Sequence, residues 1–298
     1  MTDRVIYATI PGLDVRLLSS VTTDLVAEAC ARHHTTPAAS AALGRTLTGT
    51  GLLAMTQKEH ERTTVQFVCD GPIGGIVAVA DARGDVRGYV RNPTANAEPV
   101  LGKLNVAGVV GRGTMHVGRE LGAEIGQGRE PYNGIVEITS GEIGLDFAYY
   151  LTVSEQIPSG VSLGVFVHIA TNRVLAAGGF IIQLMPGTSR DVEEDLTARV
   201  AAAPHATEMI LQGASPLEML ETALGHLEIE VLDERDLQFA CNCSRERFLD
   251  KLASLPRADL EEMVADGTGE VLTCHVCTQS YTVTIDDLRA LLPDERVH

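Results

Sequence analysis

Four cysteines near the C-terminal end constrain this chain more than any other feature. They form two short pairs, Cys241-Asn-Cys243 and Cys274-His-Val-Cys277, separated by residues 244–273. Two such pairs divided by a stretch long enough to fold are typical of a tetrahedral zinc site, where each pair supplies two thiolates from one turn of the chain. The CxxC pair is common in zinc sites, and the rarer CxC pair makes the pattern specific. We therefore expect one zinc ion bound by these four cysteines.

The residues alone leave two roles for this zinc open. It is either a closed structural site or a redox switch whose thiolates are oxidised. A catalytic zinc is disfavoured, because such sites usually have three protein ligands and one open position. His275 lies between two better ligands, so we expect it to be a bystander.

Composition limits the fold and the partners. The 298 residues allow two domains, or one large domain with an appendage, and a hydrophobic content of 45% is enough for a sizeable core. With no tryptophan and 4% aromatic residues, that core must be aliphatic. A net charge of −17 argues against nucleic-acid or membrane partners, since both select clustered lysine and arginine.

The location is expected to be cytoplasmic. The N-terminus lacks the basic start and apolar run of a signal peptide, and no stretch approaches the length of a transmembrane helix. In a reducing compartment, clustered cysteines indicate metal or redox chemistry rather than a structural disulfide. Cys30 and Cys69 stand apart, and we expect both to be small buried residues without a role.

Residues 1–187 are predicted to form an α+β domain of antiparallel sheets with helices. Short β-rich runs alternate with turn signals such as Asp70-Gly71-Pro72, as in hairpins, and a helix rich in Ala, Leu and Gly is expected to be buried against a sheet. Strands are predicted at 4–10, 14–22, 63–69, 74–82, 86–90, 134–138, 145–153, 162–170 and 177–185, and helices at 24–33 and 38–57.

Residues 188–232 are predicted to form a helical linker. Ser215 as N-cap, Pro216 at the first helical position and Glu218 completing a capping box mark the start of its last helix. Leu217, Leu220 and Leu224 form a narrow apolar stripe on that helix. The stripe either packs on the main domain or forms a surface that can be uncovered, and the spacing does not decide between these. Residues 226–233 alternate like an edge strand.

Residues 233–298 are predicted to form a small zinc-binding domain. Ser244 caps a helix from about Arg245 to Leu255, a second helix ends at Gly267, and two strands precede a last helix at 285–292. So few large apolar residues make a marginal core, and we expect this domain to fold only with metal bound. The predicted core is Phe248, Leu249, Leu252, Leu260, Met263, Val264, Val271, Leu272, Val283 and Leu288.

Arg245 and Arg247 fall in the first turn of the helix that follows Cys243. Their charge and the helix N–H groups would stabilise the thiolates and tune their reactivity. They fit the role of solvated surface residues equally well.

Taken together, these features resemble the heat-shock protein 33 family over nearly the whole chain. The cysteine spacing is the most specific part of the likeness, and the stretch Ser154-Glu155-Gln156-Ile157-Pro158 is the next. Asp70-Gly71-Pro72, Tyr132-Asn133-Gly134 and Phe239-Ala240 also agree. Ser159, where threonine is expected, and the loosely matching stretch 102–106 depart from the family pattern without touching the cysteines.

The resemblance implies a redox-regulated, ATP-independent holdase chaperone of the stress response, which is not an enzyme. The reduced chain holds zinc through the four cysteines and is inactive. Oxidation forms the disulfides Cys241–Cys243 and Cys274–Cys277, releases zinc, and unfolds the small domain and the linker. The chain then dimerises and binds unfolded client proteins. The linker stripe Leu217, Leu220 and Leu224 is our candidate for the client-binding surface.

The chemistry of the two pairs predicts an order of oxidation. A disulfide within CxC closes a very small ring, which is strained and easily reduced. We therefore expect Cys274–Cys277 to form first and Cys241–Cys243 to complete the switch.

Three other readings compete with a chaperone. A thiol–disulfide oxidoreductase would use Cys274 and Cys277, but its CxxC pair should open a helix after a strand of a βαβ unit, which nothing here matches. A zinc-ribbon nucleic-acid binder conflicts with the acidity. An enzyme with a merely structural zinc module would need a site elsewhere; Asp70, Asp81, Arg87 and Glu155 are candidate polar residues, but no nucleophile–base pair is legible. The glycines at 74, 75, 108, 111 and 113 match no phosphate-binding loop and suggest turns and bulges.

Overall fold

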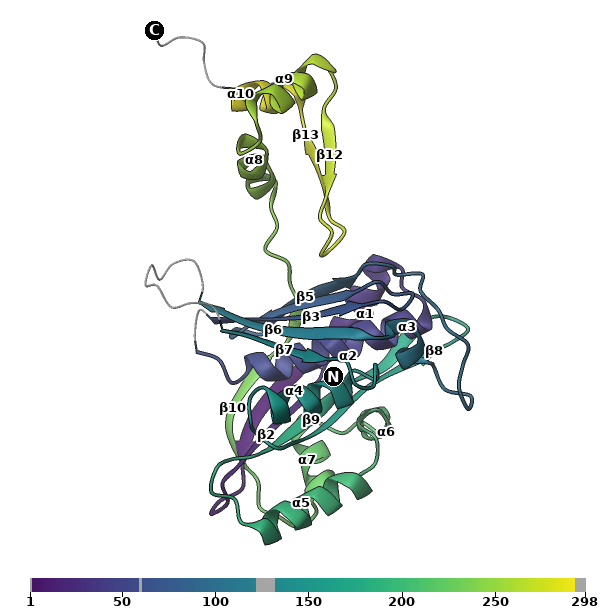
Figure 1. Cartoon of the computed structure of the whole chain (residues 1–298), viewed down its shortest axis with the longest axis vertical. Coiled ribbons are helices and arrows are strands. Elements are labelled where there is room, and N and C mark those ends of the chain that lie inside the picture. The colour runs from purple at the N-terminus through teal and green to yellow at the C-terminus, as the bar shows by residue number, and fades with distance from the viewer. Residues whose placement is uncertain (1, 59–60, 122–131, 293–298) are drawn as a thin grey trace. The chain divides into compact units, whose positions relative to one another are not determined.

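The structure is a computed structural model that describes residues 2–58, 61–121 and 132–292. The chain divides into two compact units at the Ala240–Cys241 junction (Figure 1). The mixed α+β fold class predicted from the sequence is confirmed, with antiparallel sheets and helices in the first unit.

The first sheet of the N-terminal unit has the strand order β10-β1-β2-β9-β8, and every neighbouring pair is antiparallel. A tight turn joins β1 to β2, and Gly12 in that turn has a φ of +80°, a conformation that glycine adopts without strain. β10 forms an edge of the sheet, as its alternation predicted. The strands are β1 (Arg4–Thr9), β2 (Val15–Val21), β8 (Ser159–His168), β9 (Arg173–Leu184) and β10 (Glu230–Asp236).

The second sheet has the order β11-β5-β4-β3-β6-β7, in which only the short β11–β5 pair is parallel. β6 was not among the predicted strands, because glycines interrupt its alternation. At Gly113, where β6 begins, φ is +150° and an added Cβ would lie 1.9 Å from the carbonyl oxygen of Val68 on β3. The strands are β3 (Glu61–Cys69), β4 (Ile76–Asp81), β5 (Asp85–Val90), β6 (Gly113–Leu121), β7 (Tyr132–Glu137) and β11 (Gln238–Phe239).

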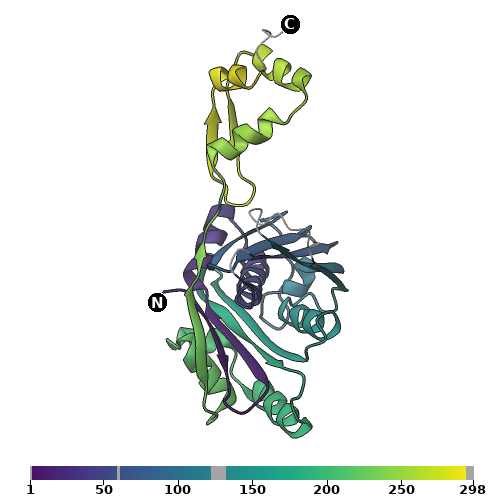
Figure 2. The same ribbon diagram turned by 90° about the vertical axis from the view of Figure 1, so that its left-hand side faces the viewer.

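A helical layer separates the two sheets, and α2 is its central element (Figure 2). α2 is buried along nearly its whole length, as predicted, and contacts strands of both sheets. Two of its buried hydroxyls are satisfied within the helix: Thr46 donates to the carbonyl of Ala42, and Thr50 donates to that of Thr46. The buried hydroxyl of Thr48 pairs instead with that of Thr22, outside the helix. The layer contains α1 (Thr23–His33), α2 (Pro37–Ala54), α3 (Val106–Val110) and α4 (Gly144–Val153). Across the described ranges, no helix is both long and apolar enough to cross a membrane.

The prediction of a strand at 145–153 was wrong, because this stretch forms α4. Its aromatic residues favour strands, but its buried residues follow helical spacing: Phe147, Tyr150 and Leu151 face the core. Asp146 fixes the start of the helix. Its buried carboxylate accepts hydrogen bonds from the backbone N–H groups of Thr139, Ser140 and Ile143.

The first sheet has an apolar core on each face, since neighbouring residues of a strand point to opposite sides. On β2, Leu18 belongs to the core between the two sheets, whereas Leu17 belongs to the second core. On β9, Ile181 and Phe180 divide in the same way. The second core lies under three helices, α5 (Arg190–Ala202), α6 (Ala206–Leu211) and α7 (Pro216–Leu224), which begin where the helical linker was predicted.

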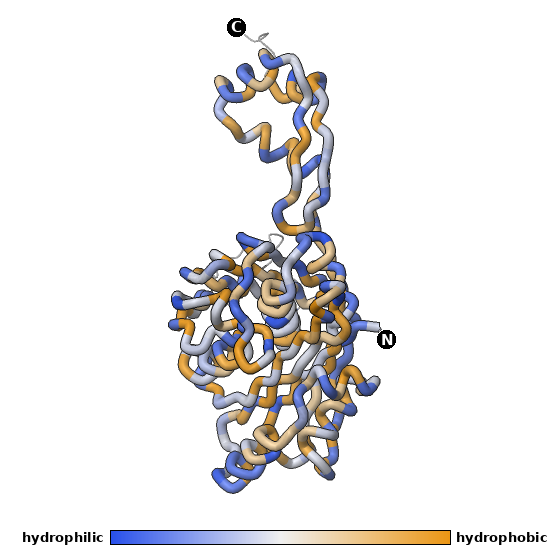
Figure 3. Tube along the Cα trace, turned by 90° about the vertical axis from the view of Figure 1, so that its right-hand side faces the viewer, coloured by the Kyte–Doolittle hydropathy of each residue, from blue (hydrophilic) through white to orange (hydrophobic). Residues whose placement is uncertain are grey.

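The C-terminal unit is small and has a thin core. It contains α8 (Arg245–Ala253), α9 (Arg257–Ala265), β12 (Glu270–Thr273), β13 (Ser280–Val283) and α10 (Ile285–Leu291), where the sequence predicted three helices and two strands. Hydrophobic and hydrophilic residues alternate along its helices (Figure 3). Among the residues that the structure describes in this unit, those buried in its apolar cluster are Leu252, Leu260, Val283 and Leu288. The predicted core residue Val271 is instead 64% exposed, since it points away from the helices on a two-stranded sheet.

Candidate metal centre

The four predicted ligands come from two loops of the C-terminal unit. Cys241 and Cys243 lie on the extended segment that runs into α8. Cys274 and Cys277 lie in the turn between β12 and β13, which is closed by a hydrogen bond from the N–H of Cys274 to the carbonyl of Gln279. The CxxC pair is therefore part of a hairpin turn rather than the start of a helix, which is not the arrangement expected of an oxidoreductase.

The sulfur atoms gather in a cluster that fits a tetrahedral metal ion. All four lie within 4.8 Å of one another. The Sγ atoms of Cys241 and Cys274 are 3.9 Å apart, and those of Cys243 and Cys277 are 3.4 Å apart. A tetrahedron with metal–sulfur distances of about 2.3 Å has edges of about 3.8 Å, so the cluster has the right size for zinc. His275 is exposed and outside the cluster, as predicted.

The thiols of this cluster differ in their electrostatic environment. Burial raises the pKa of Cys241 and of Cys277, and Cys277 is only 3% exposed. Burial acts in the same direction on Cys243, but hydrogen bonds from Tyr281 and the neighbouring thiols outweigh it and lower the pKa of Cys243. Four thiolates at this spacing repel one another strongly. A divalent cation among them removes that repulsion and holds all four deprotonated.

Tyr281 on β13 is a neighbour of the cluster that was not predicted from the sequence. Its hydroxyl oxygen lies 3.3 Å from the Sγ atom and 3.1 Å from the carbonyl oxygen of Cys243. Its ring packs against Phe248 of α8, with 5.5 Å between the ring centroids. The alternation of β13 places Tyr281 on one face of the strand, but the sequence does not show that this face meets Cys243.

Arg245 and Arg247 hold the backbone around the cluster. The Nε of Arg245 donates to the carbonyl of Thr282 at 3.1 Å, and its guanidinium pairs with Asp287. Arg247 donates to the carbonyl of Asn242 at 2.7 Å, inside the CxC segment. These contacts of both arginines go to oxygen atoms, and Arg247 fixes the peptide between the two ligands of the CxC pair.

The surroundings of the two remaining cysteines are those of structural residues packed in or against the apolar core. Cys30 is buried in the core between the sheets, and Cys69 is half-buried at the end of β3. Burial raises the pKa of both thiols, which disfavours the reactive thiolate.

The linker stripe is covered in this structure. Leu220 and Leu224 are 0% exposed and pack in the second core, and Leu217 packs against the same cluster. Met219 and Ala223 are buried beside them, so the apolar face of α7 is wider than the predicted stripe. The predicted capping box is present: Ser215 Oγ accepts from the N–H of Glu218, and the Glu218 carboxylate accepts from the N–H of Ser215.

The polar residues considered for an enzyme site have structural contacts. Asp70 accepts from the N–H of Arg112, and Asp81 accepts from the N–H of Arg83 within a turn. Arg87 is largely buried on β5. Glu155 forms an ion pair of 2.8 Å with Arg119 at a cavity of about 260 Å³.

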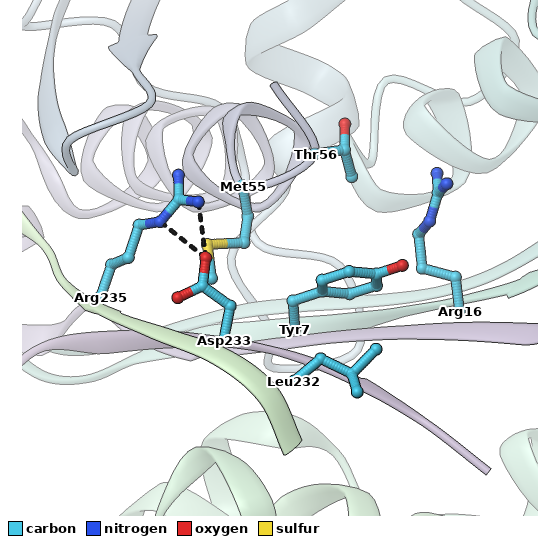
Figure 4. A pocket seen from close by; sticks show the side chains of 7 residues that line it. All are labelled: Tyr7, Arg16, Met55, Thr56, Leu232, Asp233 and Arg235. Atoms are coloured by element: carbon cyan, nitrogen blue, oxygen red, sulfur yellow. Dashed lines mark hydrogen bonds and ion pairs between the residues drawn. The ribbon is translucent and has the colours of Figure 1, made fainter. Parts of the chain in front are cut away.

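A larger cavity, of about 340 Å³, lies between the end of α2 and the strands β1, β2 and β10 (Figure 4). A carboxylate oxygen of Asp233 lies 2.6 Å from a guanidinium nitrogen of Arg235, which also donates to the carbonyl of Ala82. The guanidinium carbon of Arg16 lies 5.8 Å from the ring centroid of Tyr7. These groups satisfy one another, and we assign the cavity no ligand. Its lining residues are Tyr7, Arg16, Met55, Thr56, Leu232, Asp233 and Arg235.

The fold and the cluster define a class of protein: an α+β unit of two sheets followed by a small unit with a four-cysteine metal centre. Comparison with known proteins makes this specific. The family model described as Hsp33 protein matches residues 3–284, and the chain therefore belongs to the Hsp33 family. The resemblance seen in the sequence is thus confirmed.

Individual relatives match this chain over nearly their whole length. The chain is 44% identical to the 33 kDa chaperonin of Symbiobacterium thermophilum, covering 97% of this chain and 96% of the relative. It is 41% identical to the 33 kDa chaperonin of Shouchella clausii, covering 99% and 98%. The crystal structure of the 33 kDa chaperonin of Thermotoga maritima, a heat-shock protein 33 homologue, matches with a TM-score of 0.85 and 33% identity over 98% of both chains. Membership of this family supports a chaperone function.

Proposed function

We propose that this protein is a redox-regulated, ATP-independent holdase that binds unfolding proteins under oxidative stress. The observation that carries the proposal is the gathering of four cysteine sulfurs within 4.8 Å in a unit whose own core is thin. Metal bound there stabilises the unit, and structural zinc contributes on the order of 10–16 kcal/mol in small zinc peptides. Oxidation of the ligands removes that contribution.

The chemistry follows from the residues. A thiolate attacks peroxide, the O–O bond breaks, and the sulfur becomes a sulfenic acid while hydroxide leaves. The partner thiolate then displaces a second hydroxide and forms the disulfide. The proposed pairs are Cys241–Cys243 and Cys274–Cys277, whose members are neighbours in the sequence. Each disulfide withdraws two thiolates, so the zinc ion, one per reduced chain, is released.

The client-binding surface is proposed to be the second core. If α5, α6 and α7 leave the first sheet, they expose Leu220 and Leu224 on the helix side and Leu17 and Phe180 on the sheet side. Contiguous apolar surface of this kind marks a protein-binding site. Leu217, Leu220 and Leu224 remain the candidate contact residues, and this covered state fits an inactive chaperone.

The functional division proposed is a chaperone core at 1–187, a linker at 188–232 and a redox-switch domain at 233–298. The chain runs from α7 through β10 and β11 directly into Cys241, so the linker and the switch are adjacent in the sequence. We further propose that the activated form is a homodimer, that the protein acts in the cytoplasm, and that it has neither enzymatic activity nor nucleic-acid or membrane partners.

The test is suppression of aggregation of a thermally unfolding client without ATP. The zinc-loaded, reduced protein should be inactive, and peroxide at mildly elevated temperature should activate it, with reversal by dithiothreitol. The double variant Cys30→Ser, Cys69→Ser is the matched control and should behave like the wild type. Full activity of the reduced protein, or activation of a Cys274→Ser, Cys277→Ser variant only by peroxide, would contradict the proposal.

A further inference from the structure

The chemistry of the cluster determines which group donates the hydrogen bond between Tyr281 and Cys243. A metal-bound thiolate carries no proton, so it can only accept a hydrogen bond, and the Tyr281 hydroxyl must donate. Cys243 offers this one proton two acceptors, its sulfur at 3.3 Å and its carbonyl oxygen at 3.1 Å. The phenol hydroxyl thus contacts both the sulfur and the backbone carbonyl of the same ligand residue.

The hydroxyl is held in place by packing. The Tyr281 ring lies against Phe248, with 5.5 Å between the ring centroids. This contact joins β13 to α8, two elements of the C-terminal unit whose ribbons are labelled in Figure 1. Donors that orient and electronically tune ligands in this way commonly change metal affinity about 10- to 100-fold when removed.

We propose that Tyr281 is a positioning residue whose hydroxyl slows the oxidation of Cys243. It thereby delays formation of the Cys241–Cys243 disulfide relative to the Cys274–Cys277 disulfide. A donated hydrogen bond withdraws charge from the sulfur, which lowers its rate of attack on peroxide. The inference rests on the proposed redox switch and concerns its order.

Exposure alone would give the opposite order. Cys241 and Cys243 are half-buried, whereas Cys274 and Cys277 are 8% and 3% exposed. Without a local group that slows the reaction, peroxide should therefore oxidise the CxC pair first. The hydroxyl of Tyr281 is a side-chain donor at the more accessible pair, and it can be removed without changing the backbone.

The test compares Tyr281→Phe with the wild type in the full-length, zinc-loaded protein. During a peroxide time course, each cysteine is trapped by alkylation and quantified by peptide. Tyr281→Phe should raise the rate at Cys243 roughly three- to tenfold and bring the Cys241–Cys243 disulfide forward, with little change at Cys274. In the cobalt-substituted protein, the sulfur-to-metal charge-transfer band should also shift.

Phe248→Leu is the matched control, because it loosens the packing and keeps the hydroxyl. Unchanged rates in Tyr281→Phe, or an equal rise at all four cysteines that Phe248→Leu reproduces, would overturn the inference. If Tyr281→Phe loses zinc on purification, competition with a chelator replaces the time course. A larger loss of affinity than in Phe248→Leu then supports the role of the hydroxyl, and an equal loss overturns it.

The result of this experiment can be distinguished from the result of the test of holdase activity. The rates at single cysteines are read chemically, without a client protein. If the wild type loses zinc and gains no holding activity, the holdase proposal fails, while the effect of the hydroxyl on Cys243 is still decided.

Discussion

At Asp3, burial and hydrogen bonding have opposite effects on the charged form of one side chain of the N-terminal unit. It lies just before β1 and accepts hydrogen bonds from the N–H groups of Leu25, at 2.6 Å, and Asp24, at 3.2 Å. These groups belong to the first turn of α1, whose N-cap residue Thr22 makes no side-chain cap. Asp3 therefore caps a helix from outside it. Burial outweighs these hydrogen bonds and raises the pKa of Asp3 to about 6.

This raised pKa predicts a pH dependence of stability. Because the folded-state pKa exceeds the ordinary value of 3.8, the contribution of Asp3 is fully present below about pH 4 and is lost as pH rises through about 6. Relative to Asp3→Asn, the wild type should lose on the order of 2 kcal/mol of unfolding free energy over this range. Denaturant unfolding at several pH values measures the difference. Asp24→Asn, at an exposed position of the same helix turn, keeps the Asp3 carboxyl and should retain the pH dependence of the wild type. A wild type whose stability changes with pH in parallel with that of Asp3→Asn would refute the assignment.

The residues of the site differ in whether their roles could be predicted from the sequence. The four ligands were predictable, because short metal-ligand pairs are a local pattern. Tyr281 was not, because its contact with Cys243 spans 38 positions and depends on how β13 packs on α8. The contact of Arg245 with Asp287 was hidden for the same reason.

At the level of elements, the capping of α7 controls how firmly this helix covers the first sheet. Ser215→Ala removes the side-chain acceptor of the capping box and should weaken α7 by about 1 kcal/mol. Amide hydrogen exchange within α7 should then be about fivefold faster. If α7 covers the client surface, the variant should also respond to less peroxide than the wild type.

Thr222→Ala is the matched control for this prediction. It deletes an exposed hydroxyl on the same helix that bonds to the carbonyl of Glu218 and is not part of the cap. Its exchange should match or fall below that of the wild type. Equal exchange in all three proteins would show that α7 is held by packing alone.

The elements that could be predicted were those whose own pattern agrees with their surroundings. α2 was recognised as a buried helix because its small residues suit close contact on all sides. α4 was misread, because aromatic side chains favour strands while its burial follows the helical period. β6 was not predicted, since Gly113 serves the close approach to β3 rather than an alternating pattern.

For the whole molecule, the two units should differ in their need for metal. The N-terminal unit has two large apolar cores, whereas the apolar cluster of the C-terminal unit has four buried members among the described residues, which end at 292. A strong chelator added to the reduced full-length protein should abolish protection from hydrogen exchange in α8, β12 and β13. The strands of the N-terminal unit should stay protected, and a fragment of residues 233–298 should show helical circular dichroism only with zinc. A fragment that stays folded without metal would contradict this.

The layered architecture could be predicted only in part. Alternation and turn signals predicted antiparallel sheets, but the two-sided burial of β2 and β9 follows from helices on both faces, which no local pattern reveals. The role of α5, α6 and α7 as a cover for one of those faces likewise appears only in three dimensions.

The most direct test of the account is one peroxide titration of the reduced, zinc-loaded protein at mildly elevated temperature. Released zinc is followed with a chromogenic chelator, while hydrogen exchange of α7 and suppression of client aggregation are measured on the same samples. We expect all three to rise over the same range of peroxide and to reverse with dithiothreitol. Zinc release that leaves α7 protected and aggregation unchanged would show that the metal only stabilises its own unit and that oxidation does not switch the protein.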